Sequence, residues 1–279
     1  MVPEARTCYR IHNSKTRKKK KKHHNKYPRP WEYYKKASIM TTETTTTADP
    51  SQLFDKLEEK FRASGLGEDK WYVLATAALA GGNDPELSGP LYTHLTRQPA
   101  SSSPEQRQRL VRRLREALVK SVSIVGVCKP LEAIMAINER EAEPDKDRSP
   151  ATRAGWACDE ENLRRGMAWL SKVYTGDAGS TLGLFDDHPD FAWISKNITY
   201  GLYLSDRQVL DDLETELVVL AGIMIQNLRK ETHWHIRGIR RLGVPVEDVR
   251  VVWDCVQLVA DFLGLKLTRV PSVDDVKDV

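Results

Sequence analysis

Apolar residues recur at three- and four-residue intervals along most of the chain after position 49, and this spacing predicts helices. The predicted segments are a short stripe at Leu53, Leu57 and Phe61, an apolar run over 71–80, a helix pair over 104–138 broken near Pro130, and a helix over 160–174. The stretch over 176–191 is rich in Gly and Asp and is predicted to be a loop. The pattern predicts an all-α fold.

Two further helices are predicted within 210–242. The first carries a single apolar stripe made of Leu213, Leu217, Leu220, Met224 and Leu228. Glu216 and Asn227 fall inside that stripe, whereas Asp212 and Glu214 fall nearer the solvent side, where a helix normally keeps its acids. One carboxylate is therefore expected to point into the protein.

The second of these helices is predicted to begin near Glu231 and to end at Leu242, before Gly243. Its inward face is expected to hold Thr232, His235, Ile239 and Leu242. Its other face is expected to hold His233, Arg237 and Arg240. The two histidines of the His-Trp-His triplet should therefore diverge.

A carboxylate and an imidazole on facing helix surfaces can share a proton, so Glu216 and His235 are a candidate general acid and base. The alternative is that the two side chains form a structural hydrogen bond in the core, because structural ion pairs also occupy such positions.

The segments 216–220, 231–235 and 243–249 resemble the carboxymuconolactone decarboxylase and alkylhydroperoxidase D (AhpD-like) superfamily. Its pattern is an acidic residue in one helix, a histidine about nineteen positions on, and a small-residue turn before an acidic helix start. Glu216 and His235 have this spacing. The peroxidase branch carries a Cys-x-x-Cys pair between them, and the matching positions here hold Leu228 and Glu231. Without two thiols the disulfide chemistry of that branch cannot be carried over, and the chain is more similar to the decarboxylase branch.

The resemblance implies an AhpD-like homo-oligomer that acts on a small carbonyl, lactone or carboxylate compound as a decarboxylase or isomerase without a cofactor. In this interpretation His235 is the general base or acid, Glu216 orients it, and Glu231 is a secondary polar group. The expected substrate pocket also involves Trp234, Asn227 and His233. No metal is expected, because histidines two positions apart on a helix point away from each other.

Two other functions stay open. One is an alkylhydroperoxidase-like antioxidant role, which would need a reactive Cys128 or Cys158; Cys128 is predicted to be a buried, unreactive thiol. The other is a noncatalytic oligomeric or ligand-binding protein that retains the fold. The sequence predicts no disulfide framework, because its four cysteines are widely separated.

A faint internal repeat relates the first and last parts of the folded region. Glu116-Ala-Leu-Val and Cys128-Lys-Pro-Leu-Glu echo Glu216-Leu-Val-Val and Leu228-Arg-Lys-Glu. We therefore expect a degenerate first repeat over 50–145, an insertion over 146–206 and a second repeat over 207–279. The insertion is rich in aromatic residues, which either fill the core or wall a ligand pocket. His188 within it is expected to be a surface histidine.

Charge is divided unevenly along the chain. Residues 1–40 hold 13 Lys and Arg against 2 acids, whereas the remainder holds 30 against 37. The predicted domain is thus acidic, and binding of nucleic acid is not expected apart from the tail. Residues 1–49 are predicted to be a disordered tail and Thr-rich linker. The five consecutive lysines fit a nuclear signal or polyanion contact, a mitochondrial presequence, or an upstream extension before a working start at Met40.

No apolar run reaches the roughly 20 residues that a membrane-spanning helix needs. No secretory signal pattern is present either. The sequence therefore predicts a cytoplasmic protein without membrane contact, or a nuclear or mitochondrial one if the tail is translated.

Overall fold

The computed structural model describes residues 49–277, and within that range the chain forms helices, turns and connecting segments with no strand. The α-helices are α2 (Pro50–Arg62), α3 (Trp71–Gly81), α4 (Ser88–Thr96), α5 (Pro104–Val125), α6 (Cys128–Asn138), α7 (Glu160–Tyr174), α8 (Ala178–Gly183), α9 (Pro189–Trp193), α10 (Asp212–Met224), α11 (Arg229–Arg241) and α12 (Val246–Phe262). A π-helical segment, η5 (Ile194–Tyr203), follows α9, and short 3₁₀ turns are η1 (Pro85–Leu87), η2 (Pro99–Ser101), η3 (Glu143–Asp145), η4 (Thr175–Asp177) and η6 (Val273–Asp275). The predicted all-α class is confirmed. The predictions for residues 1–48, including Cys8 and the basic tail, lie outside the described residues.

The helix starts follow from local sequence. Asp49 caps α2 through a hydrogen bond from the Ser51 amide, and Pro50 occupies the first turn, where a missing N–H costs nothing. Reciprocal capping boxes begin two other helices: Ser103 with Gln106 at α5, and Asp211 with Glu214 at α10.

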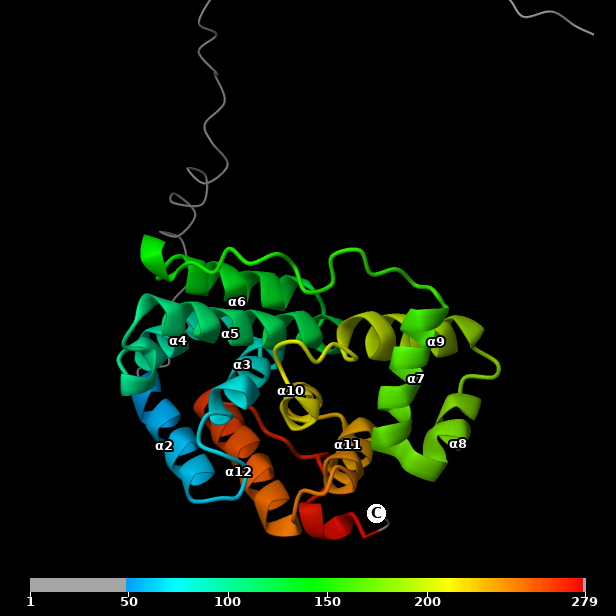
Figure 1. Ribbon diagram of the computed structural model, residues 1–279. Helices are drawn as coiled ribbons and strands as arrows, with labels where there is room; N and C mark the ends of the chain where they lie inside the picture. The colour runs from blue at the N-terminus through cyan, green and yellow to red at the C-terminus, as the bar shows by residue number, and fades with distance from the viewer. Residues whose placement is uncertain (1–48, 278–279) are drawn as a thin grey trace, which may run out of the picture. The chain divides into compact units, whose positions relative to one another are not determined.

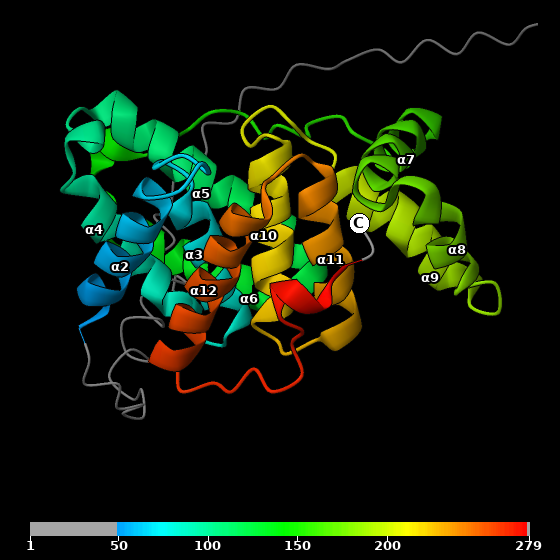
Figure 2. The ribbon, with the colours of Figure 1, turned by 90° about the horizontal axis from the view of Figure 1, so that it is seen from below.

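α10 runs through the middle of the helices (Figures 1 and 2), and all its residues from Glu214 to Met224 are buried. It packs against α3, α5, α11 and α12. α3 is also buried along its whole length. Because the side chains of these two helices are covered on every side, most of their residues are apolar, and a charged residue on α10 needs a specific partner.

A second, smaller core lies where α7 packs against η5 and α11. Its buried members are Trp169, Leu170, Val173, Tyr174, Tyr200, Leu204, Val219 and Ile223. The last two belong to α10, so this core covers the side of α10 that also faces α11. Trp169, Tyr174 and Tyr200 show that part of the aromatic content predicted for the 146–206 region fills a core.

Several boundaries differ from the sequence predictions. α10 ends at Met224 rather than near Leu228, and α11 begins at Arg229. Asn227, with φ of 60°, lies in the turn between them. Glu214 was predicted to face solvent, but it is 4% exposed. It accepts a hydrogen bond from Arg113 of α5 and also caps its own helix, so two partners replace water.

Other differences concern the outer segments. The break between α5 and α6 falls at Gly126, whose φ of 87° favours glycine, and Pro130 lies inside the first turn of α6. The predicted loop over 176–191 contains α8 and the start of α9. Cys128, predicted to be buried, is exposed at the start of α6. The internal repeat and the homo-oligomer stay predictions.

Candidate functional site

Glu216 of α10 and His235 of α11 meet in the interior. Glu216 Oε1 lies 2.6 Å from His235 Nδ1, and the two residues are 0% and 4% exposed. Because a carboxylate only accepts hydrogen bonds, this contact places the ring proton on Nδ1. Nε2 is then the nitrogen that can exchange a proton, and it makes no hydrogen bond to a residue of the described range.

The approach of the two helices depends on Gly238. A Cβ at this position would lie 2.5 Å from Val173 Cγ1 and 3.0 Å from Glu216 Oε1. The missing side chain therefore makes room for the carboxylate. The second oxygen of Glu216, Oε2, is buried and has no hydrogen-bond partner among residues 49–277. Only one of the two carboxylate oxygens therefore has a hydrogen-bond partner within residues 49–277.

His235 also lines a cavity of about 280 Å³, which we call the aromatic cavity. Its polar lining comes from Ser123, Thr181, Ser195, Thr199, Glu231 and His235, and the rest of its wall from Ile124, Leu170, Tyr174, Leu182, Phe185, Tyr200, Leu204, Val219, Ile223, Leu228 and Trp234. This volume is at the small end for ligand cavities and suits a small, largely apolar molecule. An acid-base pair thus opens onto a space that can hold a substrate.

Two tyrosines form the wall beside the histidine. The ring of Tyr174 lies 6.0 Å from that of His235, edge to face, and its hydroxyl accepts a hydrogen bond of 3.2 Å from Tyr200. Burial raises the pKa of Tyr174 to about 12 and raises the pKa of Tyr200 well above its usual value. Both hydroxyls are therefore protonated at neutral pH. The Tyr200 hydroxyl donates to Tyr174, so the Tyr174 proton is the one left for another acceptor.

The structure brings four of the six predicted site residues together: Glu216 and His235 are in contact, and Glu231 and Trp234 line the same cavity. The placement of the other two is corrected. His233 lines a different cavity, because it lies on the opposite side of α11. Asn227 lies in the turn before α11, where its Oδ1 accepts a hydrogen bond of 2.8 Å from the Arg269 amide.

Sequence reasoning did not identify Leu182 as part of this cavity, and Phe185 was recognised only as one of the aromatic residues that either fill the core or wall a pocket. Their large apolar side chains, in a stretch otherwise rich in Gly and Asp, were the signal that could have indicated a place in the cavity wall. Tyr174 and Tyr200 were recognised only as core or wall candidates. Their place beside His235 depends on the packing of α7 on α11, for which the sequence has no local signal.

The described cysteines lie away from the aromatic cavity. Cys128 and Cys158 are exposed, and Cys255 is buried among apolar groups that raise its thiol pKa to about 12. Leu228 and Glu231, which match the thiol positions of the peroxidase branch, both line the cavity. Within residues 49–277, no three His, Cys, Asp or Glu side chains are grouped so that they could hold a metal ion.

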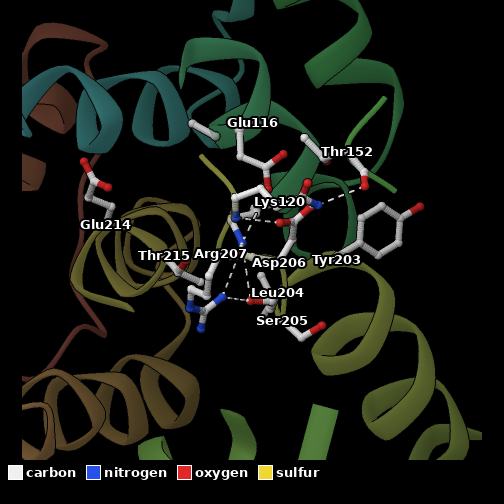
Figure 3. A network of polar contacts seen from close by, with 12 residues as sticks. Glu116, Lys120, Thr152, Tyr203, Leu204, Ser205, Asp206, Arg207, Glu214 and Thr215 are labelled. Carbon is white, nitrogen blue, oxygen red and sulfur yellow. Dashed lines mark hydrogen bonds and ion pairs between the residues drawn. The ribbon is translucent and has the colours of Figure 1, made fainter. Parts of the chain in front are cut away.

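A second buried polar cluster, the Lys120 cluster, lies between α5 and the segment after η5 (Figure 3). Lys120 is 0% exposed, and its Nζ donates to the carbonyl oxygens of Asp206 at 2.7 Å and Leu204 at 3.3 Å. Glu116 Oε1 lies 3.5 Å from the same nitrogen, and both oxygens of Glu116 accept hydrogen bonds from Arg153. Burial lowers the pKa of Lys120 to about 7. The charged groups satisfy one another, as expected of a structural cluster.

No helix within the described residues has both the length and the apolar character needed to cross a membrane.

Comparison with known proteins gives one relative. The chain is 29% identical over 138 residues to the protein named Peroxisomal protein 2 of Schizosaccharomyces pombe, a match that covers 49% of this chain and 63% of that protein. No family model matches the chain, and no solved structure matches it. The resemblance to the AhpD-like superfamily therefore stays a prediction, and this chain is similar over about half its length to a protein named for the peroxisome.

Proposed function

We propose that the protein is a cofactor-independent acid-base enzyme of the decarboxylase or isomerase type, acting on a small carbonyl, lactone or carboxylate compound. The observation that carries this proposal is the buried contact of 2.6 Å between His235 Nδ1 and Glu216 Oε1, at the edge of a cavity that His235 also lines. A histidine oriented by a carboxylate on one nitrogen and open to a cavity through its ring has the arrangement of a general base.

In the proposed reaction, His235 Nε2 accepts a proton from a carbon next to the substrate carbonyl. The imidazolium that forms keeps its hydrogen bond to Glu216, whose negative charge stabilises it. Nε2 then returns this proton to another position of the substrate, and Glu231, which lines the same cavity, is a secondary polar group near the substrate. The Tyr174 hydroxyl, which accepts from Tyr200 and keeps its own proton, can donate to the substrate oxygen and stabilise negative charge there.

The same geometry argues against the alkylhydroperoxidase-like alternative. A thiol peroxidase needs a nucleophilic thiolate at its site. Here the lining of the aromatic cavity contains no cysteine among the described residues, and the two matching positions hold Leu228 and Glu231. At the second of these positions, the carboxylate of Glu231, which can carry a proton, stands in place of a redox-active thiol.

The test is a thermal-shift screen of the full chain against small lactones, 2-oxo acids and hydroperoxides. We expect lactones or oxo acids to stabilise the protein, by about 1.4 kcal/mol at ten times Kd. Stabilisation should be lost in His235→Ala and kept in His188→Ala, which removes an exposed histidine. His235→Gln, which can still donate to Glu216, controls for a folding defect.

Compounds that bind are then incubated with enzyme in deuterated water, and deuterium at the carbon next to the carbonyl is followed by NMR. Wild type should catalyse exchange, and Glu216→Gln should reduce its rate about 100-fold, in line with a general acid-base contribution. Exchange that proceeds equally in His235→Gln would refute the proposal. Stabilisation by hydroperoxides alone would favour the peroxidase alternative.

We also propose that the chain assembles into a homo-oligomer. Val127, Leu131 and Met135 form an apolar row along the outside of α6, and their exposed fractions are 51%, 52% and 42%. A second copy of the chain would cover this row, since large apolar side chains at four-residue spacing favour packing against another helix. Light scattering should give a mass above that of one chain, and Leu131→Glu should reduce it, whereas the exposed Leu184→Glu should not.

The name of the relative suggests a second location besides the predicted cytoplasm. We propose that this chain is peroxisomal. Imaging of the full chain fused to a fluorescent protein at either end, beside a peroxisomal marker, tests this proposal. Diffuse signal in both fusions would favour the cytoplasmic prediction.

A further inference from the structure

The lining of the aromatic cavity combines uncharged hydroxyl groups with negative charge. Among the described residues that line it, Glu231 is the one acid and none is a Lys or Arg. A second carboxylate, that of Glu216, lies directly behind His235. The remaining polar groups are the hydroxyls of Ser123, Thr181, Ser195, Thr199, Tyr174 and Tyr200. Hydroxyl groups suit the neutral oxygen atoms of a ligand, whereas the two carboxylates repel an anion.

The effect of this negative charge is seen at Tyr174. Burial is the main cause that raises the pKa of its hydroxyl to about 12, and the hydrogen bond with Tyr200 opposes the rise. The negative charges of Glu216 and Glu231 raise the pKa further. Glu231 is half-buried in the first turn of α11 and forms no ion pair with a residue from 49 to 277. An anion beside Tyr174 would therefore meet both carboxylate charges.

His235 is not a cation in its reactive form. A general base needs a free lone pair, so the imidazole that accepts a proton is neutral. Its Nδ1–H already donates to Glu216 Oε1 at 2.6 Å, and the carboxylate makes this pair negative. A carboxylate bound beside the pair would have no cation as partner. Transfer of such an unpaired charge from water into a largely apolar space is strongly unfavourable.

Two cations contact residues of the wall without being among the described residues that line the cavity. Arg241 Nη1 donates to the main-chain oxygen of Tyr174 at 2.7 Å. Lys120 Nζ donates to the main-chain oxygen of Leu204 at 3.3 Å, and Glu116 Oε1 lies 3.5 Å from it. Because both cations are bound to groups of the fold, they do not change the character of the lining.

We propose that the substrate of the aromatic cavity is an uncharged β,γ-unsaturated ketone or lactone, and that the enzyme moves its double bond into conjugation with the carbonyl group. The inference rests on the proposed function and narrows it to an isomerase, because a decarboxylase must bind a carboxylate. Glu231 is then the residue that determines specificity, since its charge excludes acids.

The proton shift needs no co-reactant. His235 Nε2 removes the proton from the carbon between the carbonyl group and the double bond. The electron pair of that C–H bond forms a dienolate, whose oxygen accepts a hydrogen bond from the Tyr174 hydroxyl. Nε2 then returns the same proton to the far carbon of the former double bond, so the enzyme ends in its starting state.

Ligand-observed NMR titration of the full chain tests the charge preference with two compounds of similar shape, cyclohexanone and cyclohexanecarboxylate. At neutral pH the ketone should bind about tenfold more tightly, because like charges repel the acid. Glu231→Gln should strengthen carboxylate binding about fivefold and leave ketone binding unchanged, and Glu231→Lys should reverse the preference. Glu247→Gln, which removes an exposed carboxylate from the first turn of α12, should change neither affinity.

A wild type that binds the carboxylate as tightly as the ketone would overturn the inference, as would binding of neither compound. Equal gains in Glu231→Gln and Glu247→Gln would also overturn it, since only net charge would then matter.

Conversion of 3-cyclohexenone to its conjugated isomer, followed by ultraviolet absorbance, tests the reaction. Wild type and Glu231→Gln should both catalyse it, and His235→Gln should lower the rate about 100-fold. A ketone preference without His235-dependent catalysis would refute the proposed function and leave the charge preference standing. Deuterium exchange on 2-oxo acids that depends on His235, without conversion of the ketone, would support the proposed function and overturn this inference.

Discussion

Two buried glutamates, one hundred positions apart in the sequence, occupy similar depths and do different things. Glu116 of α5 is 4% exposed, and both of its oxygens accept hydrogen bonds from Arg153 while Lys120 lies close by. Glu216 of α10 is 0% exposed, and His235 bonds only one of its oxygens. Both oxygens of the Glu116 carboxylate are therefore hydrogen-bonded within the protein. The Glu216 carboxylate is held by a group that also lines a cavity, so burial alone does not distinguish the two glutamates, whereas their hydrogen-bond partners and their distance from the aromatic cavity do.

The largest expected effect is on the Lys120 cluster. Glu116→Gln removes the carboxylate that faces both Arg153 and Lys120, and loss of one partner from a buried pair costs about 3 kcal/mol or more. Glu216→Gln keeps an oxygen that can accept from His235 Nδ1 and should cost about 1 kcal/mol. Urea unfolding measures both. A larger loss for Glu216→Gln than for Glu116→Gln would contradict the distinction between the two clusters.

The second effect is a pH dependence of stability. In the unfolded chain Lys120 keeps its proton up to its ordinary pKa of 10.5, whereas burial lowers the folded value to about 7. Between these values the unfolded state binds more protons, so the free energy of unfolding should rise with pH, by on the order of 2 kcal/mol between about pH 7 and 9. Lys120→Met should flatten this rise when unfolding is measured across the range. An equal rise in the variant would assign it to other groups.

A third experiment concerns the space beside Glu216. Gly238→Ala places a Cβ 2.5 Å from Val173 Cγ1 and 3.0 Å from Glu216 Oε1, and this overpacking should cost about 1 to 2 kcal/mol and displace the carboxylate. Gly222→Ala on α10 is the matched control, because its nearest contact would be 3.3 Å, to Ile124 Cγ2. Thermal unfolding should separate the two, and equal losses would show that Gly238 has no special role.

The smallest expected effect concerns the tyrosine wall. Tyr200→Phe removes the hydroxyl that donates to Tyr174 and should cost about 1 kcal/mol, because the Tyr174 hydroxyl stays buried without its donor. Tyr203→Phe removes a hydroxyl with no hydrogen bond to the described residues and should be neutral. Urea unfolding of both variants measures how much this hydrogen bond contributes to the free energy of unfolding, and equal values for the two variants would show no contribution.

The regular spacing of apolar residues was enough to predict the helical class, the helix over 160–174 and the inward positions of Glu216 and His235. These are local properties of a helix. The same spacing failed at the end of α10, since Leu228 continues the apolar stripe while the chain has already turned. The turn depends on the left-handed conformation of Asn227. The spacing of apolar residues contains no signal for this conformation.

Contacts between distant segments could not be predicted. Glu214 is buried because Arg113, about one hundred positions earlier, reaches it. The hydrogen bond from the Arg269 amide to Asn227 likewise joins two segments 42 positions apart. No repeating pattern in the sequence signals either contact. Each depends on how complete helices, and the segments that follow them, pack against one another.

The burial of α10 also sets a timescale. A helix whose residues from Glu214 to Met224 are all covered by other helices cannot expose its amides by fraying, so their hydrogen exchange should require opening of the whole fold. The carboxylate of Glu216 is carried by this helix. Its position should therefore last as long as the native state itself.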